Sequence, residues 1–150
     1  MSEFQIQPLA PTQIPAVSCL FAMQLAEHAV ERSQTELTAG LTTLLAEPAQ
    51  GFVFVAVAGE KPIGVAYVAR ILSLEHGGWS GWLDELYARP EWRNRGVGSA
   101  LLAAAIAAAT EREWAALDLE VDTDHRRVIS LYQRNFFRPV SRTRFVRRLN

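Results

Sequence analysis

Hydrophobic positions in the first 50 residues form one strand-like and two helix-like patterns. Phe4 and Ile6 alternate with polar residues, which predicts a short strand. Apolar residues then recur at helical spacing to near Glu31. A second helix is predicted to begin at the capping box of residues 33–36 and to end before Pro48. This part of the chain is therefore predicted to fold as strand, helix, helix.

The remaining apolar segments alternate between short runs and one long Ala- and Leu-rich stretch. The long stretch predicts a helix from Ser99, and a further helix is predicted through Tyr132. The short runs predict strands at residues 52–57, 63–69, 82–88, 114–121 and, as a closing pair, within 136–146. The order β-α-α-β-β-β-α-β-α-β-β predicts an α/β sandwich around a mixed sheet, in one domain spanning residues 1–150.

A basic, glycine-containing turn separates the central predicted strand from the long helix. Pro90 stops the strand because it cannot donate to a ladder hydrogen bond. Gly96 and Gly98 permit left-handed angles and a close approach of a ligand to the main chain, and Arg93 and Arg95 add positive charge. A strand, such a turn and a helix N-terminus together present backbone N–H groups to a phosphate. We therefore predict a site for a phosphate-bearing cofactor.

The turn R-N-R-G-V-G fits the acetyl-CoA signature [RQ]-x-x-G-x-[GA] of the GNAT superfamily of N-acetyltransferases. The whole segment L-D-E-L-Y-A-R-P-E-W-R-N-R-G-V-G resembles the strand-to-helix segment of that family, and more loosely its diamine and polyamine branch. The resemblance implies a mostly antiparallel mixed sheet with a splayed parallel strand pair and helices on both faces. It also implies acetyl-CoA as cosubstrate.

The resemblance assigns cofactor-binding positions on both sides of the turn. Main-chain groups of Leu86, Tyr87 and Ala88 would pair with the pantetheine arm. The pyrophosphate would lie on the turn residues Arg93, Asn94, Arg95, Gly96, Val97, Gly98 and Ser99. His125 stands where many relatives have a cofactor-binding asparagine, and Phe136 replaces the usual glycine after the last helix.

Catalysis needs a base for the amine and an acid for the departing thiolate. Tyr132, in the Leu-Tyr pair of the last predicted helix, resembles the tyrosine that protonates the thiolate. Asp84 and Glu85 lie on the central strand and, by alternation, point to opposite faces. Either carboxylate can act as the base, directly or through a water molecule, and the pattern favours Asp84. The resemblance implies an acceptor pocket near the end of the first helix, with Glu27, His28 and Glu31, where acidic groups would suit a cationic amine, and with Trp82 as a pocket wall.

Composition narrows the classes of function. A 49% hydrophobic content and a net charge of −1 describe a globular protein and give no support to nucleic-acid binding. The single cysteine fits a reducing compartment, and no signal peptide or membrane span is evident, so we expect a cytoplasmic protein. The three histidines show no metal-binding spacing, so no metal is expected. Relatives are commonly dimers, which implies a homodimer.

These observations predict an enzyme that transfers an acetyl group from acetyl-CoA to a small primary amine by direct attack in a ternary complex. One alternative is an acetyltransferase for a protein N-terminus or a lysine side chain, which an open groove would favour. Another is an acyl-CoA sensor without catalysis, which the departures at His125 and Phe136 keep open.

Overall fold

A five-stranded sheet organises the first of two units in the chain. The computed structural model describes residues 2–150 and divides into Met1–Glu120 and Val121–Asn150. The strands are β1 (Gln5–Pro8), β2 (Gly51–Ala58), β3 (Lys61–Ser73), β4 (Gly78–Ala88) and β5 (Leu117–Leu119). They lie in the order β1-β2-β3-β4-β5. All neighbours are antiparallel except β4 and β5, which are parallel, so the predicted mixed, mostly antiparallel sheet is confirmed.

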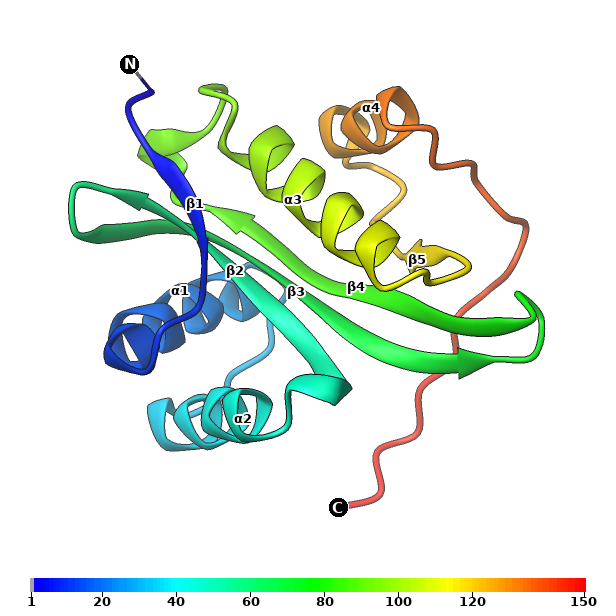
Figure 1. Cartoon of the computed structure of the whole chain (residues 1–150), viewed down its shortest axis with the longest axis horizontal. Helices are drawn as coiled ribbons and strands as arrows, with labels where there is room; N and C mark the ends of the chain where they lie inside the picture. The colour runs from blue at the N-terminus through cyan, green and yellow to red at the C-terminus, as the bar shows by residue number, and fades with distance from the viewer. Residues whose placement is uncertain (1) are drawn as a thin grey trace. The chain divides into compact units, whose positions relative to one another are not determined.

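Helices cover both faces of this sheet (Figure 1). One face carries α1 (Ile14–Glu27) and α2 (Gln34–Ala46), and the other carries α3 (Val97–Glu111). Short 3₁₀ turns at Pro11–Gln13, Pro48–Gln50 and Pro90–Trp92 connect these elements. The capping box of α2 forms as predicted, because Ser33 accepts from the Glu36 backbone and Glu36 accepts from the Ser33 backbone.

The core between the sheet and the first two helices consists mainly of branched aliphatic side chains, together with Phe21 and Tyr87. Val17 and Leu20 of α1 and Val55 and Val65 of the sheet are completely buried. Burial of each such side chain stabilises the fold by about 1.5–3 kcal/mol. On the other face α3 packs closely, because a Cβ on Gly64 would lie 2.8 Å from Val97 Cγ1. The continuous apolar run of β2 is explained by this burial on both faces.

Helices α1, α3 and α4 (Arg126–Arg134) end in the same termination motif. After α1, the Ala29 N–H donates to Ala26 O and the Val30 N–H donates to Leu25 O. This is the Schellman pattern, which places the residue after the cap in the left-handed region. The same hydrogen bonds follow α3 and α4, with Ala29, Glu113 and Phe136 at φ 57°, 55° and 67°. The prediction that the first helix continues to near Glu31 is wrong because this motif ends it at Glu27.

The second unit, Val121–Asn150, contains the helix α4 (Arg126–Arg134). Its Schellman motif includes the expected apolar contact, since the rings of Tyr132 and Phe137 lie 5.7 Å apart. The closing strand pair predicted within residues 136–146 is wrong, because no strand is assigned between residues 136 and 150. The alternating side chains there, including Phe145 and Val146, are exposed and have no sheet to pair with.

Across residues 2–150, none of the helices has the length and apolar character needed to cross a bilayer.

Candidate active site

The central strand β4 runs on after its parallel neighbour has ended. Pairing between β4 and β5 covers only Gly81 to Leu83 on β4, and β5 ends at Leu119. β4 itself continues to Ala88. The main chain of residues 84–88 therefore has no β5 partner along this edge. The resemblance implied a splayed parallel strand pair. The hydrogen-bonded pairing of β4 with β5 ends at Leu83 and Leu119, which is where these two strands separate.

A β-bulge in β4 determines how its two carboxylates are presented. Leu83 is opposite Val68 on β3, and Glu85 is opposite Tyr67, so Asp84 is the extra residue. The bulge breaks the strict alternation of side chains along the strand. Asp84 is exposed and Glu85 is half-buried, and their pointing to opposite faces stays a prediction. Burial raises the pKa of both Glu85 and Tyr67, and the negative charge of Asp84 adds a smaller increase to each.

Glu85 is the carboxyl group whose pKa is shifted furthest from its ordinary value. It is half-buried, and this burial, with a smaller contribution from the Asp84 charge, raises its pKa to about 7. Within residues 2–150 its carboxylate has no hydrogen-bonding or ion-pair partner. Asp84, which the sequence favoured as base, is exposed. A carboxylate that is half-protonated near neutral pH is suited to accept a proton from an amine.

The turn before α3 presents main-chain N–H groups at a helix N-terminus. Asn94 and Gly96 both adopt left-handed angles, at φ 63° and 83°. A Cβ on Gly96 would meet nothing within 4 Å, so glycine is needed there for its backbone angle. No side chain caps α3, and within the described chain the N–H groups of residues 94–99 donate to no protein acceptor. These groups are free to receive an anion.

The two arginines of the turn are held by carboxylates. Arg93 Nη2 donates to Glu27 Oε1 at 2.7 Å, and its Nε donates to Ala88 O at 3.1 Å. Arg95 Nη2 donates to Glu3 Oε2 at 2.6 Å. Glu27, which is predicted to bind substrate, ties the end of α1 to the turn through its ion pair with Arg93. Exposed ion pairs of this kind contribute little stability, about 0–1 kcal/mol, so a bound phosphate can compete for either arginine.

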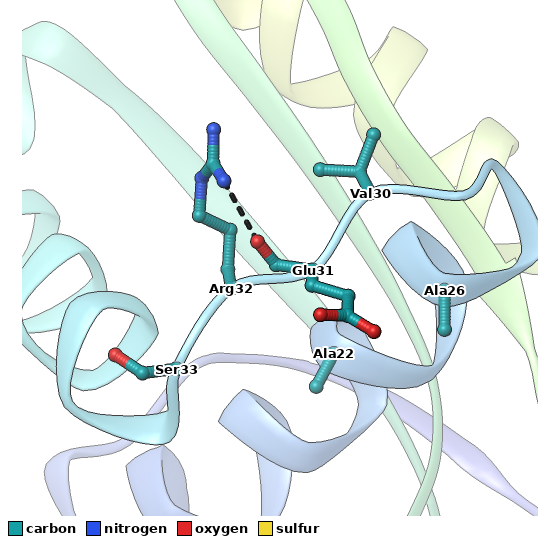
Figure 2. Close-up of a pocket in the computed structure, with 6 residues that line it drawn as sticks. All are labelled: Ala22, Ala26, Val30, Glu31, Arg32 and Ser33. Carbon is teal, nitrogen blue, oxygen red and sulfur yellow. Dashed lines mark hydrogen bonds between the residues drawn. The ribbon is translucent and has the colours of Figure 1, made fainter. Parts of the chain in front are cut away.

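An open pocket lies where α1 leads into α2 (Figure 2). Its lining consists of Ala22, Ala26, Val30, Glu31, Arg32 and Ser33. Of the predicted acceptor residues, Glu31 lies in this lining, whereas His28 caps the end of α1 and Trp82 stands on β4 opposite Asp118 of β5. Glu27, His28 and Trp82 are not among the residues that line this pocket.

Sequence reasoning missed Gln24, a buried polar residue of α1. Its side chain is only 6% exposed and contacts β4, where Nε2 donates to Leu86 O at 3.4 Å. The signal was present in the sequence, because Gln24 continues the helical face formed by the buried Val17, Leu20 and Phe21. A polar residue at such a position requires a partner.

The acetyltransferase (GNAT) family profile matches residues 19–136 of the chain, which include β4, the turn and α3. The chain belongs to this family. It is accordingly an acetyltransferase by family, and the matched segment contains the carboxylates, the turn and Tyr132. No curated protein sequence matches it.

Three solved structures show the same GNAT fold over nearly the whole chain. A putative acetyltransferase from Arthrobacter sp. FB24 is 27% identical, with 97% of this chain and 96% of that one covered and a TM-score of 0.81. A predicted acetyltransferase from Clostridium acetobutylicum, solved with acetyl-CoA, is 18% identical, with 96% of both chains covered and a TM-score of 0.80. An aminoglycoside acetyltransferase from an uncultured soil metagenomic sample, in complex with sisomicin, is 16% identical, with coverages of 99% and 97% and a TM-score of 0.79.

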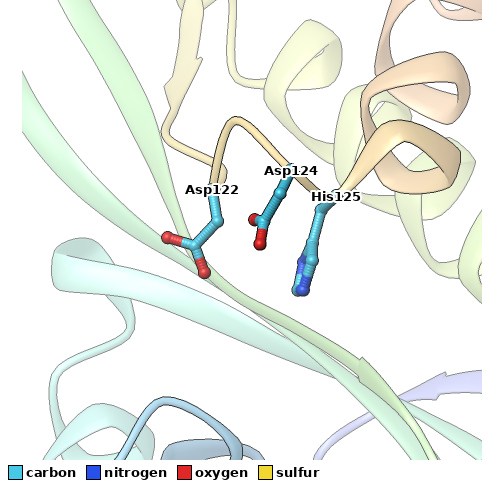
Figure 3. Close-up of side chains that lie close together, drawn as sticks. All are labelled: Asp122, Asp124 and His125. Carbon is cyan, nitrogen blue, oxygen red and sulfur yellow. The ribbon is translucent and has the colours of Figure 1, made fainter.

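The remaining GNAT positions lie in the second unit. Tyr132 is buried in α4, and His125 is the exposed residue immediately before that helix rather than part of it. The ligand atoms of His125, Asp122 and Asp124 lie within 4.8 Å of one another (Figure 3). The spacing of the histidines did not indicate this group, because two of its members are aspartates. All three side chains are exposed, as acidic groups without a metal commonly are.

Proposed function

We propose that this protein transfers the acetyl group of acetyl-CoA to a primary amine of a small molecule, with Glu85 as the general base. The observation that carries the proposal is the half-buried carboxyl group of Glu85, with its pKa of about 7. Glu85 lies on the part of β4 that extends beyond the end of β5. The uncapped N–H groups of residues 94–99 follow β4 in the chain and supply an anion site.

The turn fits the cosubstrate on its own chemistry. Two left-handed residues and a helix N-terminus without a cap direct several N–H donors to one place, which suits a pyrophosphate. The edge of β4 at Leu86 and Ala88 would offer main-chain groups to an amide-containing arm, whereas the main-chain oxygen of Tyr87, the third predicted residue, lies toward β3. Arg93, Asn94, Arg95, Gly96, Val97, Gly98 and Ser99 would hold the phosphate end, and His125 is retained as a predicted contact.

The reaction requires one proton to leave the amine and one to reach the thiolate. The amine nitrogen attacks the thioester carbonyl carbon, the C–N bond forms, and the C–S bond breaks as the thiolate departs. Glu85 takes the proton of the amine, a role that its raised pKa suits at neutral pH. Tyr132 stays the predicted donor to the thiolate.

A small, cationic amine is the acceptor class that the chain best supports. Acidic side chains lie on β4 (Asp84 and Glu85) and at the end of α1 (Glu27), and Glu31 lies in the open pocket beside α1. The similar fold that binds sisomicin acts on an aminoglycoside, a small molecule with several amino groups. We propose that the chain works as a homodimer in the cytoplasm, which size measurement and localisation would test.

Release of free thiol from acetyl-CoA, measured with a panel of small amines, peptides and lysine-containing proteins, tests the proposal. Turnover with small amines that Glu85→Gln abolishes supports it. Turnover only with peptides or proteins would replace the acceptor class. Tight binding of coenzyme A without transfer to any amine would contradict the enzymatic role and favour an acyl-CoA sensor.

A further inference from the structure

Gln24 carries a buried polar atom that the fold leaves without a partner. The residue belongs to α1 and is 6% exposed. Its Oε1 is fully buried and, within residues 2–150, accepts no hydrogen bond. Leaving an amide oxygen unpaired in the interior is costly, so such an atom in a folded protein needs an explanation.

The other end of the same amide locates it on β4. Gln24 Nε2 donates to the main-chain oxygen of Leu86 at 3.4 Å, which is long for such a bond. Tyr87 O lies toward β3, since a Cβ built on Gly64 would be 2.9 Å from it. Main-chain groups of successive strand residues point to opposite edges, so those of Leu86 point to the side where β5 has ended. The Gln24 amide therefore lies at the free edge of β4, at the residue that follows Glu85.

A primary amine has the hydrogen atoms that this arrangement can use. In its neutral form it has two N–H groups and one lone pair. The lone pair attacks the thioester, and one N–H group gives its proton to Glu85. We propose that the second N–H group donates to Gln24 Oε1, which makes Gln24 a positioning and specificity residue for primary amines. This inference rests on the proposed function.

The geometry allows the amide to take this role. The bond to Leu86 is long and weak, so the side chain can turn and present its oxygen to a ligand that enters along the β4 edge. A site that hydrogen-bonds a substrate N–H group discriminates against an analogue that lacks it, because the buried acceptor is then left unpaired. Secondary amines, which have a single N–H group, are therefore poorer substrates.

The test compares one primary amine, chosen as the best substrate in the panel, with its N-methyl derivative. Thiol release is measured for the wild-type protein, for Gln24→Met and for the exposed control Gln50→Met. Gln24→Met is expected to lower kcat/KM about tenfold for the primary amine, the effect of one lost hydrogen bond in the transition state. The N-methyl amine, the KM for acetyl-CoA and the Gln50→Met variant are expected to change less than about twofold.

Each outcome decides between the roles. An equal loss for both amines, or no loss for either, overturns the inference and leaves Gln24 a structural residue. An unfolding midpoint equal to or above that of the wild type is expected, since the substitution removes an unpaired buried oxygen. If Gln24→Met does not fold, Gln24→Asn takes its place with the same expectation, because it withdraws the oxygen by one methylene group. Absence of turnover by the wild type with any amine contradicts the proposed function instead.

Discussion

Arg93 and Glu27 join the two sides of the candidate active site, with Nη2 of the arginine 2.7 Å from Oε1 of the glutamate. Arg93 comes from the turn before α3, and Glu27 is the last residue of α1. The Arg93 guanidinium also lies over the ring of Tyr87, with its Cζ 5.4 Å from the ring centroid. The end of α1 is thereby fixed to the proposed phosphate-binding turn.

Removing the carboxylate of Glu27 should release Arg93 for a bound phosphate. We expect Glu27→Gln to lower the KM for acetyl-CoA by a factor of about 2–5, the range of a weak exposed charge interaction. Stability should change by less than about 1 kcal/mol, because both partners are nearly half exposed. Glu3→Gln, which releases Arg95 in the same way, should lower this KM to a similar extent. A higher KM in Glu27→Gln would show that the pair orders the turn.

The pH dependence of the rate should follow Glu85. Its carboxyl group is protonated below a pKa of about 7 and becomes a competent base above it, so kcat/KM should rise through this pH. Glu85→Gln should lower kcat by about 10²–10⁴-fold and remove this rise. Asp84→Asn, one residue away and exposed, should retain most of the activity. A profile unchanged in Glu85→Gln would contradict the assignment.

The same residue should make the protein less stable as the pH rises. Because the folded-state pKa of Glu85 is raised from 4.5 to about 7, the folded protein retains a proton that the unfolded chain has lost. The favourable contribution is complete below pH 4.5 and is lost as the pH rises to about 7. Urea unfolding at pH 8 should therefore find Glu85→Gln more stable than the wild type by about 1–3 kcal/mol. At pH 4 the difference should largely disappear.

The helix ends offer sites for stabilisation. Ala29 and Phe136 hold left-handed angles that cost a non-glycine residue about 1 kcal/mol or more. Phe136 is also 91% exposed, so its side chain contributes little packing. Ala29→Gly and Phe136→Gly should each raise the free energy of unfolding by about 0.5–1 kcal/mol. Gly40→Ala, inside α2 with open space at its Cβ, is the converse control and should also stabilise, because alanine favours the helix.

Gly64 sets how closely α3 approaches the sheet. A Cβ there would lie 2.8 Å from Val97 Cγ1, 2.9 Å from Tyr87 O and 3.1 Å from Leu101 Cδ1. Gly64→Ala should therefore destabilise the fold by about 1–3 kcal/mol, as other overpacked cores do. Since Val97 is the first residue of α3, the KM for acetyl-CoA should rise as well. Loss of stability with an unchanged KM would show that the packing of α3 on Gly64 does not position the turn.

The sequence by itself determined the order of the elements through β5, the α2 capping box and the turn before α3. These features are local, because periodicity, proline, glycine and capping side chains act over a few residues. The ends of α1, α3 and α4 were not readable in this way, since their left-handed positions hold alanine, glutamate and phenylalanine in place of glycine.

Tertiary structure alone decided which of the candidate residues are buried or paired with a charge. The bulge that shifts Asp84 out of register arises from the pairing of β4 with β3, and the raised pKa of Glu85 arises from burial by distant parts of the chain. The burial of Gln24 and the pairing of Arg93 with Glu27 join residues more than 60 positions apart. Desolvation and charge pairing depend on which residues meet in space, and no local pattern in the sequence encodes those meetings.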